Sequence, residues 1–268
     1  MSDALYIGAT GMQAQQLNID TIANNLVNMN TPGYKKGRVS FTDLMGVEAL
    51  RQGVVPGSGS PSADLGPLAS LPRTGYGVGI SSMGKLFDQG TLKQTGSIWD
   101  VAIQGDGFLP LTMPDGSMAF CRGGTFKVNQ DGMLATQSGQ PLKPNISIPS
   151  NATSMTIAGD GTISVTLPDQ LKPVAVGQLQ LVHFSNPGSL LPLGDNLYRT
   201  SADSGEPQAG TTAQNGLGTL QQGYLEGSNV QMVDEMVSLM VAQRTYEASV
   251  KVVQTSDELL SLVNNLRK

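Results

Sequence analysis

Glycine and proline are confined almost entirely to the interior of this chain. All 15 prolines of the 268-residue sequence lie between Pro32 and Pro207, and neither residue type occurs after Gly227. Because proline breaks a helix and glycine weakens it, long helices are permitted only at the two ends. The sequence therefore predicts two terminal helices that flank a middle part of a different kind.

The first predicted helix runs from about Ala4 to Asn30 and ends at the sequence Asn-Thr-Pro-Gly. Its apolar side chains recur at steps of three and four, which places them on one side of a helix. Gly8 and Gln15 occupy the remaining positions of this row. The predicted apolar seam consists of Leu5, Met12, Ile19, Ile22, Leu26 and Met29.

The second predicted helix runs from about Val230 to Leu266. Ser228 or Asn229 is expected to cap its start, where the acidic Asp234 and Glu235 also favour a helix N-terminus. Apolar residues again recur at helical spacing. The predicted seam of this helix consists of Val230, Val233, Val237, Val241, Ala248, Val252, Leu259, Leu262 and Leu266.

The middle of the chain shows the signals of short paired strands. Asp-Gly pairs at 115–116, 131–132 and 160–161 are typical of tight hairpin turns, because glycine accepts a positive φ. Residues 162–166 and 178–182 alternate as half-buried strands do. A span rich in Gly, Pro, Ser and Ala, residues 46–74, is predicted to be an irregular excursion that is ordered only against a neighbour, with a solvated flexible loop as the alternative.

The sequence thus predicts an α+β fold in which the terminal helices pair as a coiled coil and an antiparallel β-domain is inserted between them. The expected parts are the N-terminal helix in 1–34, a linker with the excursion in 35–98, the β-domain in 99–227 and the C-terminal helix in 228–268. Each seam exposes more apolar surface than one partner helix covers, so we expect helices of other chains to add to the packing.

Composition narrows the class of partner. Charged residues make up 14% of the chain, against about 25% in soluble proteins, so the surface is expected to be either partly buried by association or covered by neutral polar residues. The net charge of −5, with no cluster of Lys and Arg, excludes nucleic acid as the partner. No apolar run is long enough to span a membrane, and residues 1–5 lack the pattern of a cleaved signal peptide.

The sequence offers little that resembles a catalytic site. His183 is the one histidine and Cys121 the one cysteine, which is too few for a zinc site. A single histidine within a strand-like run is more often a packed or surface residue than the base of a nucleophile. The glycine-rich segments 75–79 and 105–107 lack the residues of phosphate-binding loops and are interpreted as turns. Two acids could meet in the fold to hydrolyse a substrate, but nothing favours that reading. We expect no enzyme activity, cofactor or metal.

Three long motifs resemble those of flagellar rod and hook proteins. Residues 22–35 read IANNLVNMNTPGYK, residues 100–108 read DVAIQGDGF, and residues 222–230 read QGYLEGSNV and are followed by QRTYEA at 243–248. The motifs cover both ends and the middle of the chain. Pro110 and the run Cys121-Arg122-Gly123-Gly124 depart from the family pattern, which puts the local turn geometry in question.

The resemblance implies a structural subunit of the flagellar basal body that assembles with itself into a helical tube. The length and residues 194–198 are most typical of the distal rod, while a proximal rod subunit or a hook-like protein is the alternative. A soluble β-domain that acts as an adhesin or binds a ligand is a remote one. The implied partners are further copies, proximal rod and hook proteins and a surrounding outer ring, reached through the flagellar type III export route.

The residues expected at interfaces between copies follow from these patterns. They are the seam residues of both helices other than Val230 and Val233. Asn24, Asn25 and Asn28 are expected either to hydrogen-bond between copies and fix their register, or to be solvated or cap the helix end. The last expected anchors belong to the excursion and are Leu65, Leu68 and Leu71.

Overall fold

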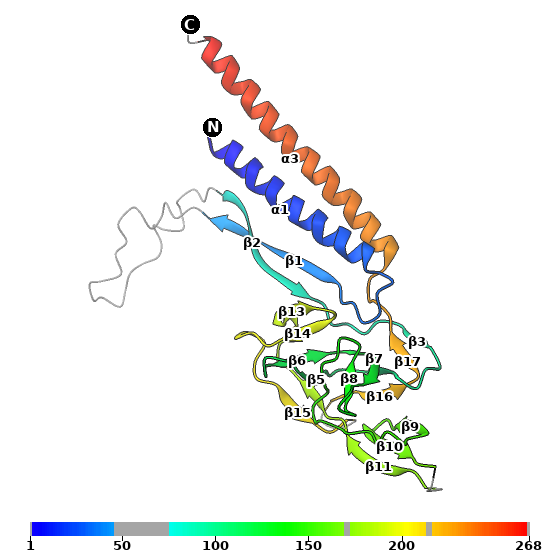
Figure 1. The fold of residues 1–268 in the computed structure, drawn as a ribbon. Helices are drawn as coiled ribbons and strands as arrows, with labels where there is room; N and C mark the ends of the chain where they lie inside the picture. Colours follow the sequence, from blue (N-terminus) through cyan, green and yellow to red (C-terminus); the bar gives the residue numbers. More distant parts are fainter. Residues whose placement is uncertain (1, 46–74, 169–171, 213–215, 267–268) are drawn as a thin grey trace, which may run out of the picture. The chain divides into compact units, whose positions relative to one another are not determined.

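A computed structural model of the protein describes residues 2–45, 75–168, 172–212 and 216–266. The chain forms two compact units. Unit 1 comprises residues 1–23, 38–83 and 236–268, and unit 2 comprises residues 24–37 and 84–235. Figure 1 shows two long helices and many short strands, so the predicted α+β class is confirmed. The two units are described one at a time.

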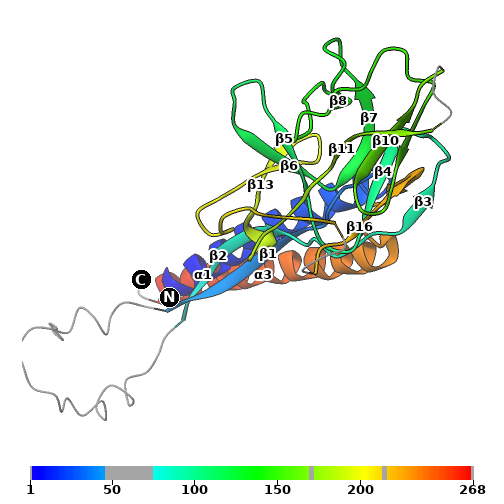
Figure 2. The ribbon, with the colours of Figure 1, turned by 90° about the horizontal axis from the view of Figure 1, so that it is seen from below.

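Unit 1 contains most of the two helices, α1 (Ser2–Val27) and α3 (Met232–Leu266). They run side by side in opposite directions, as Figures 1 and 2 both show. At a rise of about 1.5 Å per residue, α1 is about 39 Å long and α3 about 52 Å. The predicted helices are confirmed to within two or three residues at each end. Contact between them is established, while a regular coiled coil along their length remains a prediction.

Glycine lets the two helices approach closely. A Cβ atom added at Gly8 would lie 2.5 Å from Cγ2 of Val253, whereas one added at Gly11 would lie 3.5 Å from Oγ of Ser249. The predicted seam of α1 does face its own chain, since Ile22 is buried and the other seam residues are half-buried.

The side of α3 that faces α1 differs from the predicted seam. Ser249 and Val253, which meet α1, belong to a buried or half-buried row that also includes Leu239, Ala242, Ser256 and Leu260. The predicted row from Val237 to Leu262 is exposed instead. The contact side was missed because it is rich in Ser and Ala, which carry little apolar signal.

Unit 1 also contains a two-stranded sheet formed by β1 (Gly37–Met45) and β2 (Gly75–Lys85). Gly77, at φ +105°, lies against α1, where an added Cβ would be 2.3 Å from Oγ1 of Thr10. Much of the described part of the expected linker is therefore paired strand. The interpretation of residues 75–79 as a turn was wrong, because they begin β2. The excursion 46–74 lies outside the described residues.

Unit 2 is built from short antiparallel strands. They are β3 (Leu92–Gln94), β4 (Asp100–Gln104), β5 (Leu109–Thr112), β6 (Met118–Cys121), β7 (Gly123–Val128), β8 (Leu134–Thr136), β9 (Ser154–Ile157), β10 (Thr162–Thr166), β11 (Val174–Gln178), β12 (Leu181–His183), β13 (Leu191–Gly194), β14 (Leu197–Arg199), β15 (Gln208–Gly210), β16 (Thr219–Gln222) and β17 (Tyr224–Glu226). The sheet orders are β11-β10-β9, β12-β15, β13-β14-β6-β5, β16-β4-β7-β8 and β17-β3. A short 3-10 turn, η2 (Pro187–Ser189), precedes β13.

The three Asp-Gly turns are confirmed. They connect β5 to β6, β7 to β8 and β9 to β10, each an antiparallel pair, and their glycines have φ between +77° and +84°. β10 has the predicted bounds. Residues 178–181 alternate in burial as expected, but Val182 is buried as well, and the run is not one strand, because β11 ends at Gln178 and β12 begins at Leu181.

Two apolar clusters form the core of unit 2. The larger one joins side chains such as Ile103, Leu111, Leu134 and Ile163, all fully buried. The smaller one is aromatic. Phe87 and Phe108 lie edge to face with ring centroids 5.1 Å apart, and Phe87 packs in the same way on Tyr198 at 5.0 Å.

The two departures from the family pattern are accommodated within the strands. β5 continues through Pro110, which lies opposite Phe120 on β6. Burial raises the pKa of the Cys121 thiol at the end of β6 to about 11. The chain then bends at Arg122, and Gly123 and Gly124 adopt φ values of +109° and +135°, which glycine tolerates best.

Alanine substitutions at Gly8 and Gly11 test the helix contact. Gly11→Ala has room for its methyl group and should stabilise the protein by about 0.5–1 kcal/mol through helix propensity. Gly8→Ala gains the same propensity, but the methyl group displaces Val253, whose side chain has one strongly preferred rotamer in a helix. We expect Gly8→Ala to be clearly less stable than Gly11→Ala in unfolding followed by circular dichroism at 222 nm. Equal stabilisation by both would show that the helices are not in close contact.

Candidate assembly site

The chain turns sharply after α1, within unit 2. The Thr31 amide donates to the Asn28 carbonyl at 3.1 Å, and the Tyr34 amide donates to the Thr31 carbonyl at 3.2 Å. Gly33 has φ +73°, and its amide donates to the carbonyl of Glu226 at 2.7 Å. The predicted end of the first helix is confirmed, and the turn is joined to the strand that precedes α3.

A buried ionic cluster lies beside this turn. Nζ of Lys35 contacts Oε1 of Glu226 at 2.7 Å, and Nε of Arg122 contacts Oε2 of the same carboxylate at 3.3 Å. The Gly90 amide also donates to Oε1, at 2.9 Å. All three charged residues are at most 3% exposed. Because one carboxylate faces two cations, the cluster needs further acceptors.

Backbone carbonyls supply these acceptors. Lys35 donates to the carbonyl of Asp88 at 2.7 Å, and Arg122 donates to the carbonyls of Gly105 and Gly107 at 2.7 and 3.2 Å. Burial lowers the pKa of Lys35, and the Glu226 carboxylate opposes that shift. The segment 105–107, interpreted as a turn, therefore has the further role of receiving the guanidinium group.

Asn25 makes all of its hydrogen bonds inside one copy. Its Oδ1 accepts from the Gly37 amide at 2.8 Å and from the Tyr34 hydroxyl at 3.1 Å, while its Nδ2 donates to the Gly37 carbonyl at 2.9 Å and to Glu235 at 3.2 Å. The side chain is 1% exposed. The prediction that Asn25 bonds between copies was therefore wrong, because the residue has no polar atom left to offer.

Asn24 and Asn28 finish the helix end. Nδ2 of Asn28 donates to the Asn24 carbonyl at 2.9 Å, and its Oδ1 accepts from the Thr31 hydroxyl at 3.2 Å. Oδ1 of Asn24 accepts from the Tyr34 hydroxyl at 2.7 Å. Both residues match the alternative interpretation of capping. Glu235 is buried beside Asn25 and forms an ion pair with Lys36. Burial raises the pKa of Tyr34, and the Glu235 carboxylate raises this pKa further.

Asn229, which was predicted to cap α3, instead connects the segment before this helix to other parts of unit 2. Asn229 accepts from the Lys36 amide at 2.8 Å and donates to the carbonyls of Leu86 and Asp88 at 2.9 and 3.2 Å. The first helical bond instead runs from the Glu235 amide to the Gln231 carbonyl, at 3.1 Å. The cap predicted at Ser228 or Asn229 was wrong, because tertiary contacts occupy Asn229 and Ser228 accepts from the Val230 amide.

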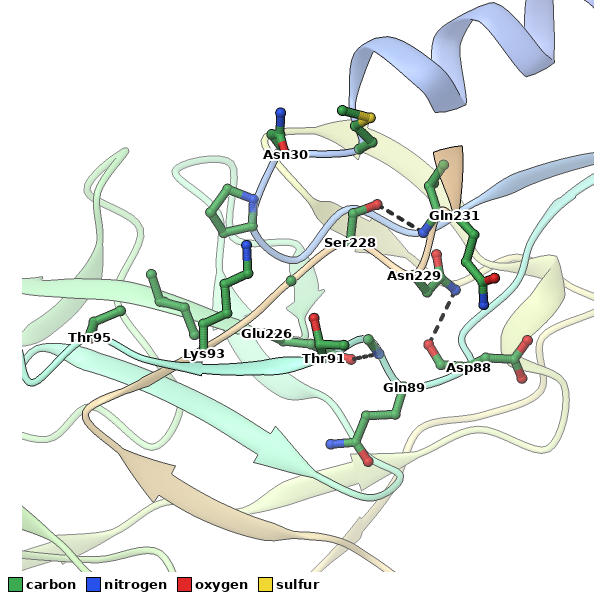
Figure 3. A pocket seen from close by; sticks show the side chains of 16 residues that line it. Asn30, Asp88, Gln89, Thr91, Lys93, Thr95, Glu226, Ser228, Asn229 and Gln231 are labelled. Carbon is green, nitrogen blue, oxygen red and sulfur yellow. Dashed lines mark hydrogen bonds between the residues drawn. The ribbon is translucent and has the colours of Figure 1, made fainter. Parts of the chain in front are cut away.

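A cavity of about 490 Å³ lies in unit 2 next to these contacts, lined by residues of 29–32, 88–95 and 225–231. Figure 3 shows Asn30, Lys93 and Gln231 around it. Within its lining, Glu226 accepts a hydrogen bond from the Gly90 amide and Asn229 donates one to the Asp88 carbonyl. Its charged groups are Asp88, Lys93 and the paired Glu226. No cluster of His, Cys, Asp and Glu suited to a metal occurs in the part of the chain that the structure describes.

The predicted interface row of α3 is exposed in a single copy. We call this row the outer stripe of α3. Its apolar members in unit 1 are Val237, Val241, Ala248, Val252, Leu259 and Leu262. The valine and leucine side chains are 49–59% exposed, and Ala248 is also exposed. The side chain of Leu266 and all of Leu65, Leu68 and Leu71 lie outside the described residues. Within the described ranges, no helix is long and apolar enough to span a membrane.

Lys35, Arg122 and Glu226 were not among the functional residues predicted from the sequence. A usable signal was present, because charged residues are rare in this chain and Lys35 and Glu226 stand inside two of the long motifs. The partners are too far apart in sequence for any local pattern to join them: residues 35 and 226 are separated by 191 positions.

Glu226→Gln tests the ionic cluster. The substitution keeps the shape of the side chain but leaves Lys35 and Arg122 buried without a counter-charge, which should cost about 3–5 kcal/mol of unfolding free energy. Glu206→Gln is the matched control, because Glu206 is exposed, and should change stability by less than about 0.5 kcal/mol. Denaturant unfolding measures both. If the two variants were equally stable, Glu226 would not hold the cluster together.

Comparison with known proteins places the chain in a family. Residues 5–35 match the family described as flagella basal body rod protein, residues 102–165 match the D1 domain of flagellar hook protein FlgE/F/G, and residues 221–266 match the C-terminal part of flagellar basal body rod FlgEFG proteins. Lys35, Arg122 and Glu226 each fall in a different one of these three matches.

Relatives match along the whole chain. The flagellar basal-body rod protein FlgG of Buchnera aphidicola subsp. Schizaphis graminum is 42% identical over 99% of this chain and 100% of its own length. FlgG of Borreliella burgdorferi is 41% identical and FlgG of Bacillus subtilis 35% identical, each over 100% of both chains. The chain therefore belongs to the flagellar rod and hook family as a structural subunit of the basal-body rod and not as an enzyme.

Proposed function

We propose that this rod subunit polymerises with copies of itself into a helical tube that carries torque from the motor to the hook. The observation that carries this proposal is the exposed outer stripe of α3. Leu259 and Leu262 are each 57% exposed, and Val241 is 59% exposed. Monomeric soluble proteins seldom leave a long, mainly apolar row uncovered.

Burial of the outer stripe provides a driving force for assembly. Fully burying a Val or Leu side chain is worth about 1.5–3 kcal/mol, and about half of that remains available where half of the side chain is exposed. Because every copy carries five large side chains on the stripe, their summed burial free energy offsets part of the loss of translational and rotational freedom on association. In the polymer, α1 and α3 of neighbouring copies would extend the antiparallel pair into a coiled-coil layer.

The rod position and partners are part of the same proposal. We place the subunit in the distal rod, between proximal rod and hook proteins and inside an outer ring, with the proximal rod as the alternative position. Residues 194–198, which suggested this position, span the hairpin turn between β13 and β14, where Asn196 has φ +56° and donates to the carbonyl of Pro32 at 2.8 Å. We further propose export through the flagellar type III route and contacts through Leu65, Leu68 and Leu71.

Leu259→Asp tests the role of the outer stripe in assembly. The change puts a charge on the row that we expect to be buried between copies, at a cost of several kcal/mol per contact on the order of the buried-charge penalty. Electron microscopy of the purified protein should show tubes for the original chain and none for the variant. Motility of a strain that carries only the variant should also fail.

Gln254→Asp is the matched control for Leu259→Asp. Gln254 is exposed on the same helix and lies off the outer stripe, so the same aspartate there should leave tubes and swimming intact. Both variants should keep the helical circular dichroism of the original chain. Normal tubes with Leu259→Asp would remove the basis of the proposal.

A further inference from the structure

The outer stripe of α3 contains one charged side chain. Arg244 stands between Val241 and Ala248 at helical spacing, so it lies on the same row, and it is exposed. The ion pairs found among the described residues are Lys35–Glu226, Lys36–Glu235 and Arg122–Glu226, so Arg244 has no ion-pair partner there. A lone cation on an apolar row that is to be buried requires an anion from the surface that covers it.

The outward side of α1 carries the opposite charge. We call the exposed row at steps of three and four along this helix the outer stripe of α1, and it consists of Tyr6, Ala9, Gln13, Gln16, Asp20 and Ala23. Asp20 is its one charged member and also has no ion-pair partner among the described residues. The helix Ser2–Val27 contains no Lys or Arg.

We propose that the outer stripe of α3 in one copy packs on the outer stripe of α1 in a second copy, with Arg244 and Asp20 forming an ion pair between the chains. This inference rests on the proposed function and deepens it, because it names the surface that covers the stripe. The ion pair sets which residues of the two helices lie opposite each other, a role for which single polar positions in apolar helix contacts are well suited.

Charge and size both favour this pairing over the two symmetric ones. An α1 stripe packed on an α1 stripe would leave Asp20 facing uncharged residues or another Asp20, and two α3 stripes would do the same with Arg244. Lys251, exposed beside the α3 stripe, adds a second cation near Arg244. The two alanines of the α1 stripe also leave room for the valines and leucines of α3. The exposed acids of α3 within unit 1 lie off the stripe, and they are Glu247, Asp257 and Glu258.

Charge reversal tests the ion pair. Asp20→Arg and Arg244→Asp should each raise the protein concentration needed for tubes by at least about tenfold, since each places two like charges together. The double variant Asp20→Arg with Arg244→Asp should bring the concentration back toward the original value. Asp257→Arg is the control, as an exposed residue of α3 off the stripe, and should leave it unchanged. Circular dichroism checks that every monomer keeps its helices.

The outcomes separate this inference from the proposed function. Tubes that form normally with either single reversal, or a double variant that is not restored, would overturn the ion pair while self-assembly stands. If the original chain formed no tubes under any condition, the proposed function would fail first and this inference with it.

A cysteine experiment gives a second and independent test. One preparation carries Ala23→Cys, and another, with a different tag, carries either Val241→Cys or Ala248→Cys. If Asp20 lies opposite Arg244, residue 23 lies opposite 241 when the helices are antiparallel and close to 248 when they are parallel. Mixed tubes under mild oxidation should give a disulfide between the two tags in one of these combinations, while the buried Cys121 stays unreactive. No mixed disulfide in either combination contradicts the proposal.

Discussion

The carboxylate of Glu226 is the contact on which unit 2 depends. It accepts hydrogen bonds from Lys35, Arg122 and Gly90, and its own backbone carbonyl accepts from Gly33. These groups come from the turn after α1, the bend between β6 and β7, the segment before β3 and the end of β17. Removing one partner from a buried ionic cluster costs far more than the cluster contributes in net stability, so the arrangement specifies which segments meet.

The cluster also joins the three separate stretches of this chain that match the family. Lys35, Arg122 and Glu226 each fall within a different family match, and they are brought together by a single carboxylate. A motif at the end of α1 is therefore constrained by residues near the start of α3. The β-domain takes part through Arg122, which reaches the carbonyls of Gly105 and Gly107.

Patterns that depend on neighbouring residues were sufficient to predict much of the fold. The absence of Pro and the apolar spacing located both helices, and the Asp-Gly pairs located three hairpins, because the local backbone decides each of these features. Long-range contacts decide the features that were missed. Asn229 does not cap α3, because its side chain forms hydrogen bonds with the backbone of Lys36 and Leu86. Asn25 forms its hydrogen bonds with Gly37 and with Glu235, which is 210 residues away. The inner side of α3 was missed because Ser249 and Ala242 look like surface residues.

The polar groups that stabilise a single copy are different from those that we propose to align neighbouring copies. Around the turn after α1, Asn25, Lys35 and Glu226 use their hydrogen-bonding atoms within the chain, so these buried groups cannot also specify how copies align. Apolar side chains supply attraction between helices but little preference for one register, since a shift along the row exchanges one contact for a similar one. We propose that register in the tube comes from charged side chains that the single copy leaves exposed on the outward rows of its helices. On the outer stripes of α1 and α3, Asp20 and Arg244 are the residues that meet this requirement.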